Sequence, residues 1–308
     1  MKALVTGGAG FIGSHIADML LEKGCSVAVI DDLSTGNRSN LNSRATFYEK
    51  DIEAAGVGEI FAEEKPDVVF HTAAQISVSR SVREPVEDAR INIIGSIKLL
   101  EHCVSAGVKK IVFSSSGGTV YGEVPGEPAA EDAPFNPFSP YGIGKMCFEF
   151  YLAFFHNQHG LNYTVLRYGN VYGPRQDPHG EAGVVAIFTR AMLEGRTPTI
   201  NGDGKYYRDY VFVEDVARAN LACIEKGDGR VFNVGTGTLT DVVQIFGHLK
   251  KATGFDKPAD FGPHRPGDLR RSLLNIERAE KELGWTPQVP MDEGMRKTVE
   301  FFRARMSG

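Results

Sequence analysis

A glycine-rich loop near the N-terminus is the feature that most restricts the fold of this chain. Thr6-Gly7-Gly8-Ala9-Gly10-Phe11-Ile12-Gly13 follows the apolar run 3–5 and opens a segment with helical spacing. The GxxGxxG spacing of Gly7, Gly10 and Gly13 permits a tight turn and lets backbone N–H groups approach a pyrophosphate without an intervening Cβ. The N-terminus of the following helix adds a partial positive charge. We therefore predict a dinucleotide site on a strand–loop–helix unit; a tight turn with a helix cap is the alternative.

An acidic residue at the end of the next predicted strand indicates which dinucleotide fits. Asp31 follows the apolar run 27–30 and lies 18 residues after Gly13. A carboxylate there accepts hydrogen bonds from the adenosine ribose and repels a 2′-phosphate. Asp32 comes next and no Arg is adjacent, so we expect NAD in preference to NADP.

The rest of the chain alternates strand-length apolar runs with helical segments. The runs at 67–70, 110–113 and 163–168 are nearly continuous in apolar residues, which is typical of parallel strands buried on both faces. Helices are predicted from residue 91 to 106 and from Ser139-Pro140 to Gly160, because Ser suits the N-cap, Pro the first helical position and Gly the C-terminal stop. We predict the α/β class: a doubly wound, Rossmann-like parallel sheet over residues 1–170. A smaller C-terminal α/β substrate-binding domain is expected over residues 171–308, from which some segments return to the first.

Composition excludes several other classes of protein. The 308 residues are 42% hydrophobic and 24% charged, with a net charge of −5, which argues against a disordered chain and against a dedicated nucleic-acid binder. The four cysteines form no CxxC motif, no apolar stretch approaches the length of a membrane span, and the N-terminus has no apolar signal region. We expect a cytoplasmic protein without a membrane anchor.

A tyrosine and a lysine lie one helical turn apart at the start of the long predicted helix. Tyr141 and Lys145 share one helix face. A phenol with a pKa near 10 is a poor base at neutral pH, but a neighbouring ammonium and the charge of an oxidised nicotinamide favour the phenolate. The glycines at positions 142 and 144 indicate that another segment packs closely against this turn, since each costs a helix about 1 kcal/mol. A surface i,i+4 pair is the plain alternative for the two side chains.

Three serines end the strand predicted over 110–113. Ser114, Ser115 and Ser116 lie at the sheet edge where doubly wound folds bind ligands. A hydroxyl there can bind a substrate alcohol or carbonyl, or it can simply cap the strand in a turn. We favour capping for Ser114 and function for Ser116.

The ordered set of motifs resembles the extended short-chain dehydrogenase/reductases and, among these, the UDP-glucose (UDP-galactose) 4-epimerases. The motifs are TGGAGFIG, DDLSTG, SSSGGTVYG, SPYGIGK, LRYGNVYGPRQ and RDYVFVEDVA, and the likeness extends from Met1 to Pro287. It implies retained NAD, a UDP-sugar substrate, 4-epimerisation through a transient 4-keto sugar, and a homodimer. The segment 148–155, rich in Phe and Tyr, would be either a two-helix dimer seam or core.

The resemblance also implies site residues. The catalytic residues that it implies are Ser116, Tyr141 and Lys145. Cofactor contacts fall to Gly7, Gly10, Phe11, Ile12, Gly13, Asp31, Asp32, Leu33, Ser34, Thr35, Gly36, Asp51, Ile52, Thr72, Ala73, Ala74, Gln75, Asn92, Ser114, Tyr141, Lys145 and Tyr168. Substrate contacts fall to Ser116, Tyr141, Asn170, Val184, Thr199, Asn201, Arg208, Arg265, Asp268 and Ser272. Arg208 and Arg265 suit the diphosphate because a guanidinium fork matches phosphate oxygens.

This chain departs from the family pattern at two places. One extra residue lies between the serines and Tyr121; counting from the left selects Ser116 and counting back selects Gly117, and only Ser116 carries a hydroxyl. Ser272 stands where some members carry a bulky aromatic beside the sugar. A small residue there leaves room for an N-acetyl group, so N-acetylated UDP-sugars are expected to be accepted as well.

Three other interpretations fit the sequence less well. A nucleotide-sugar 4,6-dehydratase needs an Asp-Glu pair after the strand-end hydroxyl, where this chain has Gly117 and Gly118; a decarboxylase belongs to the same alternative. A catalytically silent NAD-binding regulator is disfavoured because Tyr141 and Lys145 are both present. His156 and His159 have no nearby carboxylate or Cys to complete a ligand set, so we expect no metal.

Overall fold

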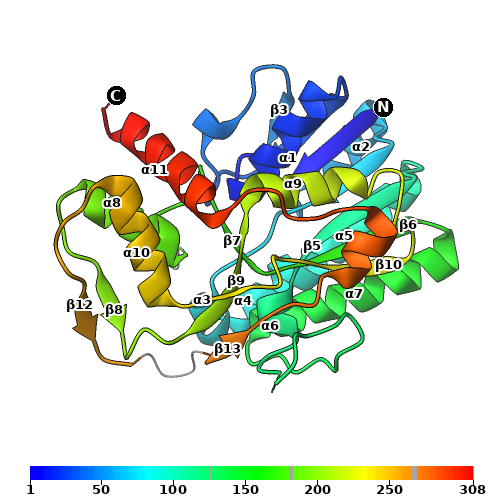
Figure 1. Cartoon of the computed structure of the whole chain (residues 1–308). Helices are drawn as coiled ribbons and strands as arrows, with labels where there is room; N and C mark the ends of the chain where they lie inside the picture. The colour runs from blue at the N-terminus through cyan, green and yellow to red at the C-terminus, as the bar shows by residue number, and fades with distance from the viewer. Residues whose placement is uncertain (125, 180–182, 265–268, 308) are drawn as a thin grey trace.

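The larger part of the molecule is built on a parallel sheet of seven strands (Figure 1). The computed structural model describes residues 1–124, 126–179, 183–264 and 269–307. The strands run, in spatial order, β10 (Arg230–Val234), β6 (Asn162–Tyr168), β5 (Lys110–Ser116), β4 (Val68–His71), β1 (Lys2–Thr6), β2 (Ser26–Asp31) and β3 (Thr46–Glu49). This confirms the predicted doubly wound α/β fold.

The strand order reverses direction beside β1, and this creates the ligand crevice. Leu4 of β1 pairs with Ala28 of β2 on one side and with Val69 of β4 on the other. In such a sheet the loops that leave neighbouring strands in opposite directions open a crevice at the carboxyl edge. The glycine loop after β1 and the segment after β4 therefore meet there.

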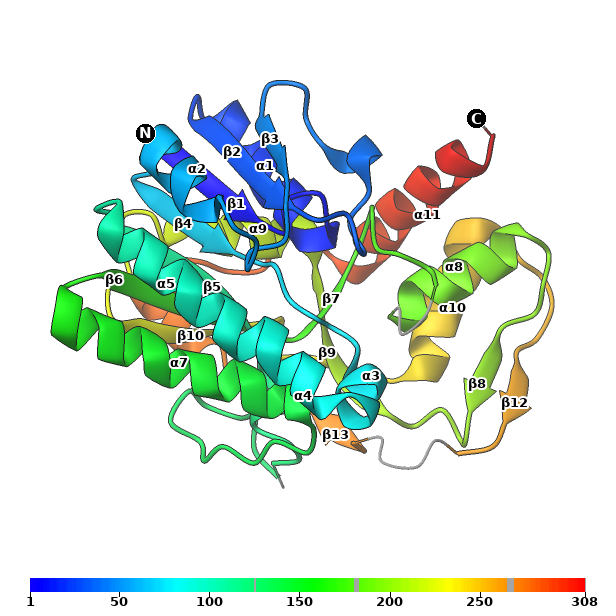
Figure 2. The same cartoon turned by 180° about the vertical axis from the view of Figure 1, so that it is seen from behind.

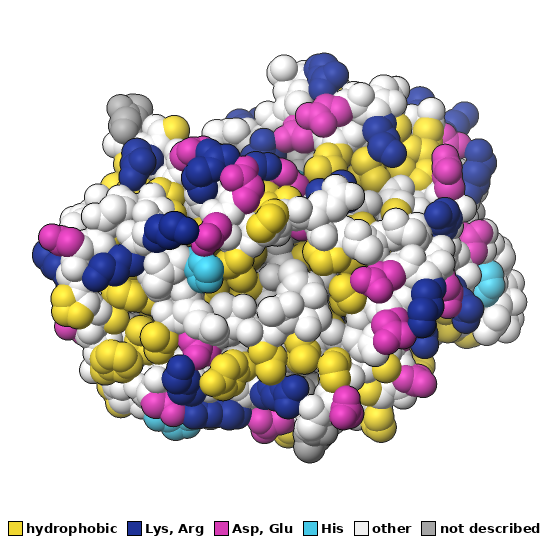
Figure 3. Space-filling view, in the orientation of Figure 1, with side chains coloured by type: hydrophobic (Ala, Val, Ile, Leu, Met, Phe, Trp, Pro, Cys, Tyr) yellow, Lys and Arg dark blue, Asp and Glu magenta, His cyan; other side chains and the backbone are white. Residues whose placement is uncertain are grey.

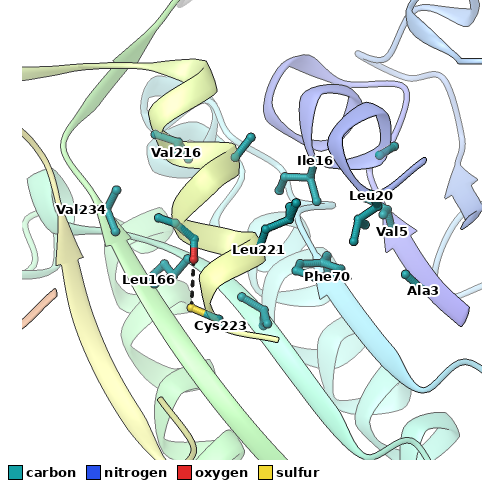
Figure 4. Packing of buried hydrophobic residues seen from close by; sticks show 14 of the residues in the cluster. Ala3, Val5, Ile16, Leu20, Phe70, Leu166, Val216, Leu221, Cys223 and Val234 are labelled. Carbon is teal, nitrogen blue, oxygen red and sulfur yellow. Dashed lines mark hydrogen bonds between the residues drawn. The ribbon is translucent and has the colours of Figure 1, made fainter. Parts of the chain in front are cut away.

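Helices cover both faces of this sheet. One face carries α1 (Phe11–Glu22) and α9 (Val213–Ala222); the other carries α2 (Val57–Glu64), α5 (Ser96–Ser105) and α7 (Pro140–His159), as Figures 1 and 2 show. Figure 4 shows how Ile16 and Leu20 of α1 and Leu221 of α9 pack with strand residues such as Phe70. Full burial of a side chain of this size contributes about 1.5–3 kcal/mol. Because both faces are buried, the strand sequences lack polar alternation.

The long helix begins and ends where the sequence predicts. The side chain of Ser139 accepts a hydrogen bond from the Gly142 N–H at 3.2 Å, Pro140 occupies the first turn, and Gly160 ends the helix at φ +71°. The helix predicted from residue 91 differs, because a π-helical turn, η2 (Arg90–Gly95), precedes α5. Single π turns of this kind often lie at functional sites.

A smaller region follows β6 and surrounds a second core. Its strands are β7 (Asn170–Tyr172), β8 (Thr199–Asn201), β9 (Tyr207–Phe212), β11 (Leu239–Thr240), β12 (Asp260–Gly262) and β13 (Arg271–Ser272), and its helices are α8 (Val184–Leu193), α10 (Val242–Thr253) and α11 (Met291–Ser307). β9 pairs with β7, β11 and β13, while β8 pairs with β12. Both α9 and β10 return to the larger sheet. The division of the chain into two domains at residue 170 stays a prediction. The segments α9 and β10 follow residue 170 in the sequence but pack with the larger sheet.

Short elements complete the described chain. They are η1 (Arg38–Asn40), α3 (Val78–Arg83), α4 (Pro85–Ala89), α6 (Gly117–Val120) and η3 (Ala279–Leu283). In the segment 148–155, Phe148 and Leu152 are buried in the core, whereas Phe150 and Phe154 are exposed. The dimer seam stays a prediction.

Candidate active site

The glycine loop between β1 and α1 forms a cradle that side chains would fill. Gly7 has φ +71°, and a Cβ built there would lie 2.7 Å from the backbone nitrogen of Ala73. A Cβ on Gly13 would lie 2.3 Å from the Gly7 carbonyl oxygen. Gly10 is the N-cap of α1 and provides no side-chain cap, so the first N–H groups of the helix remain available to a phosphate. Phe11 and Ile12, both half-buried, begin the helix. The loop therefore fits the pyrophosphate of a dinucleotide.

Asp31 at the end of β2 organises the loop that follows. Its carboxylate accepts the N–H of Ala9 at 2.9 Å and the N–H of Leu33 at 2.8 Å. Burial raises the pKa of Asp31, and these two backbone donors act in the opposite direction. A carboxylate has about four acceptor sites, so Asp31 can also accept a hydrogen bond from a ribose hydroxyl. This arrangement fits the adenosine end of NAD.

The predicted cofactor contacts that follow β2 and β3 lie at the same edge of the sheet. Asp32, Ser34 and Thr35 are exposed, Leu33 and Gly36 are half-buried, and the Asp32 carboxylate accepts bonds from both the N–H and the hydroxyl of Ser34. Asp51 and Ile52 follow β3, with Asp51 half-buried and Ile52 buried.

The segment after β4, which carries the predicted cofactor contacts Thr72 to Gln75, is fixed by a buried polar cluster. The side chain of Asn92 on η2 accepts the Gln75 N–H at 2.9 Å and donates to the Gln75 carbonyl at 2.9 Å. Asp88 on α4 accepts from the side-chain amides of Gln75, at 2.7 Å, and Asn92, at 3.1 Å. Thr72 donates its hydroxyl to the Thr6 carbonyl at 2.6 Å, and Ala73 and Ala74 are half-buried beside it. The amides of Gln75 and Asn92 are therefore engaged within the protein and shape this wall.

Lys145 and Tyr141 share one face of α7. The Lys145 ammonium donates to the Ser114 carbonyl at 2.9 Å, and its Nζ lies 5.6 Å from the centre of the Tyr141 ring. Burial lowers the pKa of Lys145 to about 8, while Asp88 and Glu149 raise it. Burial raises the pKa of the Tyr141 phenol, and the Asp88 charge adds to that effect.

The close neighbours of Gly142 and Gly144 explain why this turn of the helix carries glycine. A Cβ on Gly142 would lie 2.7 Å from the Thr119 carbonyl oxygen, and a Cβ on Gly144 would lie 3.3 Å from the Asn92 Cβ. The prediction that another segment packs closely here is confirmed: α6 approaches on one side and η2 on the other.

The three serines at the end of β5 have different surroundings. The Ser114 hydroxyl lies 3.0 Å from the Tyr168 hydroxyl, and the Ser115 hydroxyl donates to Glu149 at 2.6 Å. Both serines are buried, whereas Ser116 is half-buried and, among the described residues, its hydroxyl has no hydrogen-bond partner. Ser116 is thus the serine whose hydroxyl is left for a ligand.

Tyr168 lies in the core beneath these serines. It is buried, and its hydroxyl is also the acceptor for the Asn220 side-chain amide at 2.8 Å. Burial raises the pKa of Tyr168. The structure gives it a supporting position behind Ser114, and its predicted contact with the cofactor stays a prediction.

A buried ion pair that the sequence reasoning missed lies behind the serines. Arg167 of β6 and Glu149 of α7 join at 2.5 Å with side chains only 4% and 6% exposed. Arg167 also donates to the Tyr121 hydroxyl at 2.7 Å and to the Glu131 carbonyl at 3.0 Å. The signal was available: Arg167 interrupts an apolar strand, and Glu149 interrupts an apolar helix. One guanidinium thus links α7 to both ends of the serine turn, through Glu149–Ser115 on one side and Tyr121 on the other.

Three predicted substrate residues come together opposite the serine turn. Ser272 of β13 pairs with Arg208 of β9, and a Cβ on Gly118 would lie 3.9 Å from the Ser272 hydroxyl and 4.0 Å from the Asn170 side-chain oxygen. Ser272 is half-buried in a strand, not in a loop pointing to solvent. Asp209, beside Arg208, is buried and accepts from Thr236 and Gly237, which fixes β9 at this point.

Three further predicted substrate residues, Val184, Thr199 and Asn201, lie on elements farther from α7. Val184 begins α8, and Thr199 and Asn201 are the ends of β8, which Figure 1 places at the opposite side of the smaller region. Arg265 and Asp268 lie outside the described residues.

The described residues contain no cluster of three His, Cys, Asp or Glu side chains suited to a metal ion, nor any helix long and apolar enough to span a membrane. On the face drawn in Figure 3, basic and acidic side chains are interspersed.

Comparisons with known proteins agree on one family. A sequence model of the NAD dependent epimerase/dehydratase family matches residues 3–235. A UDP-glucose 4-epimerase of Mycolicibacterium smegmatis is 50% identical over 309 residues, which cover 98% of this chain and 99% of that protein. A crystal structure of UDP-glucose 4-epimerase with UDP-glucose from Thermotoga maritima is 55% identical, with a TM-score of 0.97 and coverage of 99% and 100%. A UDP-N-acetylglucosamine 4-epimerase of Methanobrevibacter ruminantium is 38% identical, with a TM-score of 0.94 and coverage of 99% of both chains.

Proposed function

The chain belongs to the NAD dependent epimerase/dehydratase family, and from that premise we propose that it catalyses the NAD-dependent epimerisation at C4 of a UDP-hexose. The observation that carries this proposal is the placement of Tyr141, Lys145 and the unengaged hydroxyl of Ser116 at the carboxyl edge of the sheet, beside the glycine cradle. The glycine cradle and the Asp31 carboxylate would hold NAD, which would supply reversible hydride transfer at C4 of the sugar.

The chain's own residues move and hold the proton. Tyr141, as phenolate, takes the proton from the 4-hydroxyl as the 4-keto sugar forms, and gives it back after the sugar has turned over. Ser116 donates a hydrogen bond to the same oxygen. No net oxidation occurs, because the hydride and the proton both return.

Electrostatics explain why a lysine accompanies the tyrosine. Burial alone raises the pKa of Tyr141, so a buried phenol needs a nearby positive charge to ionise. The Lys145 ammonium, 5.6 Å from the ring centre, supplies that charge while it is protonated, and burial lowers its pKa to about 8. The hydrogen bond to the Ser114 carbonyl fixes the ammonium at the site.

The substrate assignments extend the site into the smaller region. Arg208 suits the diphosphate, and Asn170 and Ser272 lie close enough to the serine turn to face the sugar. Thr199 and Asn201 on β8 then face the uridine end, with Val184, Arg265 and Asp268 as further contacts. The chain divides accordingly into a NAD-binding part over 1–170 and a mainly UDP-sugar-binding part over 171–308.

The site also disfavours dehydration. A dehydratase needs an acidic side chain directly after the strand-end hydroxyl, but a Cβ on Gly117 would lie 2.7 Å from Leu274 Cδ2. Accommodating a carboxylic acid there would require Leu274 to move, so an epimerase fits this turn better.

We also propose that the chain forms a homodimer through the exposed apolar stripe of α7 and the elements beside it. Ile143, Phe150 and Phe154 recur along one face of α7, and Ile94 and Val86 are exposed on the adjoining η2 and α4. Figure 2 shows α7 beside α5 and α4. A second copy related by a twofold axis would cover this stripe with the same residues. Sedimentation of wild type and Phe150→Glu tests it: the variant should sediment as a monomer, and an unchanged sedimentation coefficient would reject this interface.

A cytoplasmic location is the remaining part of the proposal. All four cysteines are free, and Cys103 and Cys223 are buried, which suits a reducing compartment. Fractionation of expressing cells tests this directly, and recovery outside the cytoplasmic fraction would contradict it.

The decisive experiment needs no added cofactor. Purified protein is incubated with UDP-galactose, and in parallel with UDP-N-acetylgalactosamine, while the C4 epimers are followed. We expect both to convert, and the protein to release NAD on denaturation. Release mainly of NADP would contradict the assignment of Asp31, and no conversion with a full complement of NAD would contradict the function.

A further inference from the structure

Asp88 is a buried carboxylate for which the proposed chemistry has no use. Its side chain is only 2% exposed, and one oxygen, Oδ1, accepts from the amides of Gln75 and Asn92. The other oxygen, Oδ2, is buried and has no hydrogen-bond partner among the described residues. An unpartnered buried carboxylate oxygen is costly unless a positive charge nearby compensates it.

The geometry shows which way this oxygen faces. A Cβ built on Gly144 of α7 would lie 3.7 Å from Asp88 Oδ2. Lys145 is the next residue of that helix and carries a buried ammonium whose one hydrogen bond goes to the Ser114 carbonyl. No direct ion pair joins Asp88 to Lys145 in the described part of the chain, so the two charges influence each other electrostatically without direct contact. Figure 2 shows α4 lying against the N-terminal part of α7.

We propose that Asp88 is a positioning residue that supplies the counter-charge for the buried Lys145 ammonium. The inference rests on the proposed function, in which Lys145 must stay charged to support the Tyr141 phenolate. Gly144 makes the arrangement possible, because its missing side chain lets the carboxylate approach the helix.

The other charged groups around Lys145 do not fill this role. Glu149, one turn later on α7, is already paired with Arg167. His71 on β4 is buried, and burial lowers its pKa to about 3, so it is neutral. Arg80 on α3 is half-buried and paired with Glu84, and its positive charge favours the ionised form of Asp88 without being a counter-charge for Lys145.

The charge of Asp88 acts on both members of the catalytic pair. It raises the pKa of Lys145 and also that of Tyr141. Burial raises the pKa of Asp88 itself, while the Gln75 amide, the Lys145 ammonium and the Asn92 amide favour its ionised form. Removing the charge should therefore shift both limbs of a bell-shaped pH–rate profile in the same direction, toward acid.

The first test is Asp88→Asn, which keeps the oxygen that accepts from Gln75 and Asn92. We expect both limbs of the kcat profile to move to lower pH by about one pH unit, because a nearby charge is removed. Glu87→Gln is the matched control, because it makes the same change one residue earlier on an exposed carboxylate paired with Arg90; its profile should not move. A lowered plateau with unmoved limbs would show a merely structural role and overturn the proposal.

The second test does not depend on catalysis. The free energy of unfolding is measured by urea titration for wild type, Asp88→Asn, Lys145→Met and the double variant. If the two charges balance, the double variant loses less than the sum of the single losses, by about 1.4 kcal/mol for a coupling of one pKa unit. Should Asp88→Asn alone fail to fold, recovery of folding in the double variant supports the proposal and continued failure overturns it.

If the losses in free energy of unfolding of the two single variants add up to that of the double variant, the proposal that Asp88 balances Lys145 is also overturned. If wild type shows no epimerisation, the proposed function fails, while the unfolding cycle still decides whether Asp88 balances Lys145.

Discussion

Arg167→Met tests whether the buried ion pair behind the serines positions the active site. Methionine keeps the length of the apolar stem but removes the guanidinium. Glu149 then remains buried, with the Ser115 hydroxyl as the hydrogen-bond donor left to it. Breaking a buried pair by removing one partner costs about 3–5 kcal/mol, because an uncompensated charge stays inside. We expect a loss of that size in the free energy of unfolding, measured by urea titration.

The double variant Arg167→Met/Glu149→Leu separates stability from positioning. Replacing the whole pair by apolar side chains is often neutral or stabilising, so much of the lost stability should return. The hydrogen bonds to Tyr121 and Ser115 do not return, because neither new side chain can make them. The kcat of the double variant should therefore be below that of the wild type, although its stability recovers. The KM for the UDP-sugar should change little.

Two results would refute this reasoning. A loss below about 1 kcal/mol in the single variant would mean that removing Arg167 does not leave Glu149 as an uncompensated buried charge. Full recovery of both stability and kcat in the double variant would mean that the pair holds the fold alone and does not position the serine turn.

Three further predictions concern single residues. Tyr141→Phe should lower kcat by about 10²–10⁴-fold while leaving the NAD content unchanged, and Ser116→Ala should cost less because Tyr141 remains; near wild-type turnover in Tyr141→Phe would contradict its assignment as the base. Ser272→Tyr should suppress the N-acetylated substrate selectively, since a steric clash in a packed site costs about 1–3 kcal/mol; an unchanged ratio of the two kcat/KM values would exclude Ser272 as the gate. Burial lowers the pKa of His71 from 6.5 to about 3, so the unfolded chain binds a proton in that window that the folded protein does not, and stability should fall as the pH drops through it. His71→Gln should flatten this acid dependence in urea titrations, and an unchanged slope would contradict it.

Much of the fold was predictable because it depends on local patterns. The apolar runs that became β1, β2, β4, β5 and β6 are continuous, and such runs identify strands buried on both faces. The limits of α7 followed from Ser139, Pro140 and Gly160, whose preferences act within one turn of the chain. The π turn of η2, which packs against α7, was not predicted, because the helical spacing of the sequence does not distinguish it from an α-helix.

The sequence by itself determined the features that depend on the spacing of residues close together in the chain. Gly7, Gly10 and Gly13 specify a cradle, and the four-residue separation of Tyr141 and Lys145 places both on one helix face, because turn and helix geometry are local.

Only the tertiary structure decided which groups are free to act. Three adjacent serines look equivalent in sequence, but partners from distant elements, Tyr168 and Glu149, engage two of them and leave Ser116. Likewise Asp88, 57 residues before Lys145 in the sequence, lies against α7 beside Gly144 only because α4 packs there. Burial and long-range contacts set charge and hydrogen bonding, and neither can be read from neighbours in the chain.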